Sequence, residues 1–284
     1  AQLEPVFLGG VTVVNASLHN YDQIEKLDIR LGDTVIVKRS GEVIPYVIGP
    51  VTGARDGSET PIQPPSQCPF CNTTIIQPEG LVDYYCPNIT CPERVYRSLE
   101  FFVSKGAMDI EGMGGQTVKL LIDKGLIHDE ADIFTLQAEP LLELDGFGEK
   151  KVDNLLVSIA TAKQRPLDQL IASLGIDGVG SVVAGTLADR FRSIEALQTA
   201  SVEAIDEIEG IGEVLAQSVV EWFAAPHHQH LIEKFRAAGV NMQAAEKVKA
   251  GDSLAGKTFV LTGTLPTLSR EKAAALIESH GGKI

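Results

Sequence analysis

Four cysteines form the clearest metal-binding pattern in the chain. They lie in two close pairs, Cys68 with Cys71 and Cys86 with Cys91. Two such pairs joined by a loop can place four thiolates tetrahedrally around one Zn²⁺. A set of four thiolates leaves no coordination position open for water, so we expect the zinc to be structural rather than catalytic. The alternatives are two disulfides, which need an oxidising compartment, and an iron site with the same ligands.

A second pattern, an acidic residue followed by glycine, an apolar residue and glycine, occurs four times. A helix N-terminus carries unpaired backbone N–H groups and a partial positive charge, and glycines before it let a phosphate approach closely. A fixed period indicates one supersecondary unit used four times, here with first glycines 34, 32 and 32 residues apart. We number these units hairpins 1 to 4; their glycine pairs are Gly112 and Gly114, Gly146 and Gly148, Gly178 and Gly180, and Gly210 and Gly212.

Nearby charges rank the four hairpins as phosphate-binding sites. Hairpin 2 has Phe147 between its glycines and Lys150 and Lys151 just after them, where ammonium groups would reinforce the backbone donors. Hairpin 3 has two arginines farther along its helix. No Lys or Arg occurs between residues 193 and 233, so hairpin 4 is expected to bind phosphate least and mainly to complete the packing. Its acidic residues are Glu203, Asp206, Glu207, Glu209 and Glu213.

The glycine pattern suggests two other interpretations. A dinucleotide-binding GxGxxG motif is excluded because the sixth position is never glycine or alanine and because helices, not strands, precede the glycines. Tight turns chosen only for packing remain the alternative. Three histidines, His227, His228 and His230, follow Pro226, and we expect them to be solvated at the start of a helix rather than to bind metal.

Composition limits the possible functions. The 284 residues carry a formal net charge of −14, which opposes long-range attraction to nucleic acid, so phosphate binding must depend on backbone donors. No apolar run reaches the length of a membrane helix, and the sequence predicts a cytoplasmic protein without membrane association.

Several elements must position these residues. We expect a small all-β unit over 1–66, a zinc finger over 67–96, an all-α domain of four helix-hairpin-helix repeats over 97–243, a linker over 244–253 and the start of another domain over 254–284. In the last segment a strand is predicted over 257–263, followed by a helix that Ser269 and Lys272 introduce. Both ends of the chain resemble interrupted elements. The order in which the hairpins pair is open.

Read in order, these features closely resemble the C-terminal portion of bacterial NAD-dependent DNA ligases over essentially the whole chain. The most specific parts are Leu18-His19-Asn20, Gly32-Asp33, Gly41-Glu42-Val43-Ile44-Pro45 and the order of the domains. The resemblance implies an OB-fold barrel over 1–66, helix-hairpin-helix repeats that hold the DNA backbone across the minor groove, and a BRCT domain that begins in 254–284.

The resemblance also assigns roles to residues of the β unit. The turn with Val43 and Ile44 is expected to pack into the minor groove near the nick, although the residues alone would equally suit a core. Lys38 and Arg39 precede this turn and are expected to contact phosphates; the alternative is a solvated strand end. In the BRCT segment, Thr262-Gly263 and Gly281-Gly282 match phosphate-binding positions of relatives that recognise phosphopeptides.

The family seals nicks between a 5′-phosphate and a 3′-hydroxyl during replication and repair, using a lysine in a KxDG motif that this sequence lacks. We therefore expect a monomeric chain in the nucleoid that binds nicked duplex DNA without sequence preference but neither adenylates nor seals. NAD⁺ and Mg²⁺ would act in an upstream adenylation domain of the same polypeptide. The alternatives are a noncatalytic module of a repair nuclease and an acidic protein-interaction scaffold.

Overall fold

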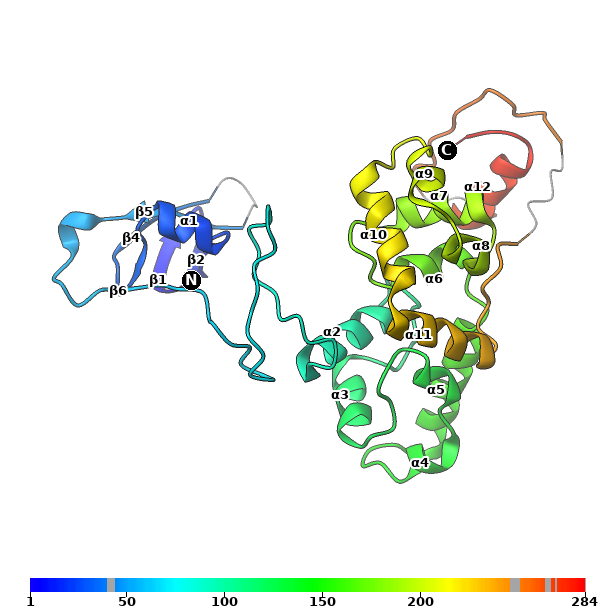
Figure 1. The fold of residues 1–284 in the computed structure, drawn as a ribbon, viewed down its shortest axis with the longest axis horizontal. Helices are drawn as coiled ribbons and strands as arrows, with labels where there is room; N and C mark the ends of the chain where they lie inside the picture. Colours follow the sequence, from blue (N-terminus) through cyan, green and yellow to red (C-terminus); the bar gives the residue numbers. More distant parts are fainter. Residues whose placement is uncertain (40–43, 246–250, 264–266, 269, 284) are drawn as a thin grey trace. The chain divides into compact units, whose positions relative to one another are not determined.

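The computed structural model describes residues 1–39, 44–245, 251–263, 267–268 and 270–283 (Figure 1). The chain forms two compact units, Ala1–Val95 and Tyr96–Ile284. In the part that is described, no helix is long and apolar enough to cross a membrane.

The described residues of the first unit form six strands, which pair two by two and always antiparallel. β1 (Gln2–Leu8) pairs with β2 (Val11–Asn15), β3 (Arg30–Leu31) with β6 (Thr60–Pro61), and β4 (Val35–Lys38) with β5 (Tyr46–Pro50). A parallel bridge from Ser17 to Tyr46 links the first and third pairs. A short 3₁₀ helix, η1 (Thr52–Ala54), follows β5. The buried core of this unit consists of Ala16, Ile24, Ile29 and Val47.

The prediction of an all-β unit is wrong in one respect, because a helix, α1 (Tyr21–Lys26), lies between β2 and β3. Asn20 caps it: its side-chain oxygen accepts a hydrogen bond from the backbone N–H of Gln23 at 2.9 Å. Ile24 fixes the helix on the core. The signal was present in the sequence as an asparagine cap before a short amphipathic run, but it was obscured by the alternating pattern on either side.

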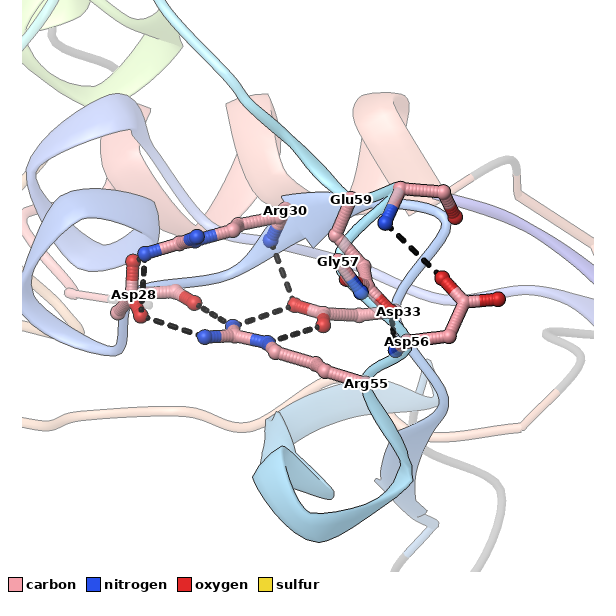
Figure 2. A network of polar contacts seen from close by, with 8 residues as sticks. Asp28, Arg30, Asp33, Arg55, Asp56, Gly57 and Glu59 are labelled. Atoms are coloured by element: carbon pink, nitrogen blue, oxygen red, sulfur yellow. Dashed lines mark hydrogen bonds and ion pairs between the residues drawn. The ribbon is translucent and has the colours of Figure 1, made fainter.

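Arg55 joins the loop after η1 to the turn before β4 (Figure 2). Its Nε and Nη2 donate to the two carboxylate oxygens of Asp33 at 2.7 and 2.9 Å, and its Nη1 donates to Asp28 at 2.7 Å. Asp33 also accepts from the backbone N–H of Arg30 at 2.7 Å. The side chain of Asp33 is only 1% exposed. This arrangement fixes the bend between the strand pairs by charge rather than by apolar packing.

The Arg55 network predicts acid sensitivity of the first unit. Hydrogen bonds from Arg55 lower the pKa of both Asp28 and Asp33. A carboxyl group whose pKa is lowered by folding contributes stability above its unfolded pKa and loses it as the pH falls. We therefore expect the melting temperature of this unit to drop by several degrees below about pH 4, and Arg55→Gln to weaken that dependence. Calorimetry against pH, with Arg39→Gln as the control, tests this; equal acid sensitivity in both variants would contradict it.

The second unit is helical. Two short segments, η2 (Asp132–Thr135) and α8 (Ile194–Gln198), connect the longer elements. The helices before the hairpins are α2 (Pro92–Val103), α4 (Ala138–Leu142), α6 (Leu167–Ser173) and α9 (Val202–Asp206). Those after the hairpins are α3 (Gly115–Asp123), α5 (Glu149–Ala162), α7 (Ser181–Phe191) and α10 (Glu213–Ala224), and α11 (Pro226–Ala237) follows α10.

Three phenylalanines connect the beginning of this domain to its end. Phe102 of α2 stacks on Phe235 of α11 with ring centroids 5.7 Å apart, and Phe134 of η2 meets both rings edge-on. Beside them, Lys234 of α11 forms ion pairs with Asp129 and Asp132. Helix α11 therefore closes the domain onto its first helix.

The last described residues form one helix, α12 (Arg270–Ser279), between two short paired segments. Thr258 and Lys283 make a parallel bridge, and the backbone N–H of Phe259 donates to the carbonyl of Lys283 at 2.7 Å. The strand predicted over 257–263 is thus reduced to this bridge among the described residues. Ser269, expected to introduce the helix, lies outside them.

Candidate metal centre and nucleic-acid interface

The four cysteine sulfurs of the first unit converge. All lie within 4.8 Å of one another, with Cys71 and Cys86 3.5 Å apart and Cys68 and Cys91 3.8 Å apart. These distances exclude a disulfide bond of about 2.05 Å, and the cysteines are free. Four sulfurs at about 2.3 Å from a tetrahedral Zn²⁺ would lie roughly 3.8 Å apart. The donor set therefore fits a closed structural zinc site.

Tight turns position the thiols. After Cys68, Asn72 adopts a left-handed φ of 55°, and its backbone N–H donates to the Cys68 carbonyl at 2.9 Å. Cys91 directly precedes α2, and its carbonyl accepts the N–H of Val95 at 3.0 Å. Hydrogen bonding with Thr73 lowers the pKa of the Cys71 thiol to about 6. A neighbouring contact, Tyr84 edge-on to Tyr21 at 5.4 Å, attaches the finger to α1.

The four hairpins share one backbone geometry. In each, the first glycine has a φ between 78° and 86°, a left-handed conformation that favours glycine. The apolar residue between the glycines is buried, and its N–H donates to the carbonyl three residues earlier. The second glycine is the N-cap of α3, α5, α7 or α10 and provides no side-chain acceptor. In α5, α7 and α10 the N–H groups of the first two residues are therefore available to an anion, whereas the carboxylate of Glu100 lies beside Gly115 at the start of α3.

The hairpins pair first with second and third with fourth. A side chain at Gly112 would lie 3.8 Å from Leu155 of α5, and one at Gly178 would lie 2.9 Å from Leu215 of α10. In the second pair, the hydroxyl of Ser218 also donates to the carbonyl of Asp177 at 3.0 Å. Each odd-numbered hairpin thus packs on the helix that follows the next hairpin, which answers the question that the spacing left open.

Each pair encloses a groove, and the two grooves differ in chemistry. The groove between hairpins 1 and 2, which we call groove 1–2, has a volume of about 1170 Å³ and is lined by Gly112, Gly148, Lys150 and Lys151. Groove 3–4, of about 490 Å³, has Val214 and Leu215 in the positions of the two lysines. This difference in charge is the one from which hairpin 2 was predicted to bind phosphate better than hairpin 4.

The residues of hairpin 2 that were predicted to bind DNA differ in their surroundings. Phe147 is buried, and the ammonium group of Lys151 lies 3.6 Å from the centre of its ring while donating to the carbonyl of Gly146 at 3.3 Å. Lys150 is exposed at the mouth of the groove. Phe147 therefore holds Lys151 against the turn instead of facing outward itself.

In the first unit, Ile44 is 73% exposed, so the core alternative does not hold for this residue. Its neighbour Val43 lies outside the described residues. Lys38 ends β4, and the guanidinium of Arg39 donates to the carbonyl of Gly9 at 3.4 Å.

The three histidines form no metal cluster among the described residues. His227 and His230 are exposed, as expected, but His228 is half-buried. The ring of His228 stacks on Trp222 with centroids 3.9 Å apart.

Sequence reasoning missed the part of groove 1–2 that lies farther along α5 from hairpin 2. Asn154, Ser158 and Thr161 of α5 line it, together with Arg165 beyond the end of the helix. Their spacing of three or four residues could have shown that they share a face.

Models of known families match four stretches of the chain. The NAD-dependent DNA ligase OB-fold domain matches residues 1–59, and the NAD-dependent DNA ligase C4 zinc finger domain matches 67–92. A SAM-like helix-hairpin-helix tandem matches 105–161, and a helix-hairpin-helix motif matches 169–232.

Curated relatives named DNA ligase align with the entire chain. The protein of Roseiflexus sp. is 53% identical over 287 residues, that of Chloroflexus aurantiacus 54% over 286, and that of Herpetosiphon aurantiacus 51% over 285. The chain spans about two fifths of their length, with 40%, 40% and 42% covered. At this identity along the whole chain, and with the ligase OB-fold and zinc-finger domains both matched, the chain is similar to part of the NAD-dependent DNA ligases.

Proposed function

We propose that this chain is the DNA-binding part of an NAD-dependent ligase, which holds a nicked duplex while adenylation and sealing take place elsewhere in the same polypeptide. The observation that carries the proposal is the pairing of hairpins whose uncapped helix N-termini open into a groove that contains Lys150 and Lys151. Backbone donors at several such termini can hold phosphates sequence-independently, even in an acidic protein.

The other parts have supporting roles in this proposal. The exposed Ile44, with Lys38 at the end of β4 and Arg39 directly after it, suits an apolar contact with a distorted minor groove near the nick. The zinc finger is a rigid joint without open coordination sites. Residues 254–284 would begin a BRCT domain. NAD⁺ and Mg²⁺ would bind outside this chain, which contains no KxDG lysine.

The double variant Lys150→Ala/Lys151→Ala tests the ranking of the hairpins. We expect it to weaken binding to a nicked duplex about tenfold and to reduce the salt slope by up to about 2, since each phosphate contact contributes about 0.9. Fluorescence anisotropy across a salt series measures both quantities. As a matched series in hairpin 4, Glu209→Gln and Glu213→Gln should leave binding unchanged or slightly stronger. Weaker binding in that series would contradict the ranking.

Joining an upstream adenylation domain to the chain separates the ligase from its alternatives. The joined protein should seal a nick with NAD⁺, whereas the chain alone should bind the nick without forming an adenylate. DNA cleavage by the chain would favour the nuclease module. Absence of salt-dependent DNA binding by the zinc-loaded chain would favour the interaction scaffold.

A further inference from the structure

Helix α5 carries a line of polar side chains that leads away from hairpin 2. The line, which we call the α5 track, consists of Lys150, Asn154, Ser158, Thr161 and Arg165. Steps of three or four residues place the first four on one face of α5, Arg165 follows three residues after the helix ends, and all five line groove 1–2. The 14 residues of α5 span about 21 Å at 1.5 Å per residue. The track therefore extends far beyond the hairpin turn.

Most donors of the track have no protein partner. Among the described residues, no hydrogen bond involves the side chains of Lys150, Asn154 or Ser158. Arg165 uses one nitrogen, Nη2, which donates to the carboxylate and the carbonyl of Asp109 at 3.0 and 3.3 Å. Its Nε is buried without a partner. The Arg165 side chain as a whole is still 30% exposed, so the rest of its guanidinium remains accessible to a ligand in the groove.

The repeat itself does not require this track. The equivalent positions after hairpin 4, each 64 residues later, are Val214, Ser218, Trp222, Ala225 and Gln229. Val214 is 88% exposed, the hydroxyl of Ser218 is committed to Asp177, and Trp222 stacks on His228. The two helices follow hairpins of the same geometry. Packing therefore does not explain why α5 presents unpaired polar groups at these positions and α10 does not.

We propose that the α5 track binds the DNA phosphate backbone beyond the hairpin, with Arg165 contacting a phosphate at its far end. This inference rests on the proposed function. The groove is also lined by Asp109, Glu111 and Glu149. Their three carboxylates balance the charges of Lys150, Lys151 and Arg165, so the net electrostatic field in the groove is small. Binding along the track must then come from donors at short range, and Nη1 of Arg165, which forms no hydrogen bond among the described residues, supplies such a donor.

Three variants separate phosphate binding by Arg165 from a purely structural role. Arg165→Gln should weaken binding to a nicked duplex roughly three- to tenfold and lower the salt slope by about 1, whereas Arg165→Lys should keep most of the slope. Asp109→Asn removes the ion pair but keeps the cation, so the slope should be unchanged. If Asp109→Asn weakens binding as much as Arg165→Gln does, and neither variant changes the slope, Arg165 only positions hairpin 1 and the proposal is overturned.

A second comparison tests the middle of the track. Asn154→Ala/Ser158→Ala should weaken binding roughly threefold, and Ser218→Ala, at the position in groove 3–4 equivalent to Asn154, should have no effect. Thermal melts confirm that all variants fold. If the wild-type chain shows no salt-dependent binding, the proposed function itself fails. If it binds and responds to Lys150→Ala/Lys151→Ala but not to the variants at Asn154, Ser158 and Arg165, only the extension of the track beyond the hairpin is refuted.

Discussion

Replacing Cys91 with serine is expected to abolish zinc binding and unfold residues 67–92. In this fully described stretch the only buried side chains are Cys68 and Cys91. Three of its large apolar side chains, Phe70, Leu81 and Ile89, are 51–58% exposed. The finger therefore has no apolar core that could replace the metal. Structural zinc contributes about 10–16 kcal/mol of apparent binding free energy to small domains of this kind, and a serine hydroxyl is a poor substitute for a thiolate.

Metal analysis and NMR of the finger amides measure this prediction. The wild-type protein should contain one equivalent of zinc, and Cys91→Ser close to none. Ser66→Ala, a change of an exposed side chain just before the finger, is the control. The second unit should melt as in the wild type, because the buried residues of α2, Leu99, Phe102 and Val103, belong to its core. Full zinc content with unchanged finger amides in Cys91→Ser would contradict the prediction.

Features set by local backbone chemistry could be predicted from the sequence. A left-handed φ at the first glycine of each hairpin needs a residue without a Cβ, so the glycine spacing indicated the turns directly. The cysteine spacing likewise indicated a four-sulfur cluster, which the sulfur distances confirm. Both signals depend on residues that are close in the sequence.

Features set by contacts between distant residues could not be predicted in this way. The pairing of the hairpins depends on Gly178 meeting Leu215, 37 residues away by their numbers. The contact of Arg165 with Asp109 crosses 56 residues and has no local signature. Helix α1 was missed for a different reason, since its single short turn competes with strands on both sides. The sequence thus indicated the glycine turns and lysines of the hairpins but not which helix face continues the groove.

Phe102→Ala is expected to produce the largest loss of stability in the second unit. Phe102 is fully buried, and its ring contacts Phe134 and Phe235, so truncation leaves a cavity at the point where α2, η2 and α11 meet. Phenylalanine truncations in well-packed cores cost about 3–5 kcal/mol. The adjacent Phe101 is 47% exposed and provides a matched control, for which Phe101→Ala should cost less than about 1 kcal/mol.

Urea unfolding of the second unit measures both variants, and a double-mutant cycle identifies the cause. If the stacked rings of Phe102 and Phe235 act together, Phe102→Ala and Phe235→Ala should be non-additive by about 0.5–1.5 kcal/mol. Equal costs at Phe101 and Phe102 would show that burial in this triad does not control stability. Because α11 closes the domain through Phe235, loss of the triad should also loosen the hairpin pairs. DNA binding by Phe102→Ala should therefore be weaker only at temperatures at which part of the unit has already unfolded. The protein that remains folded should bind DNA with an unchanged salt slope.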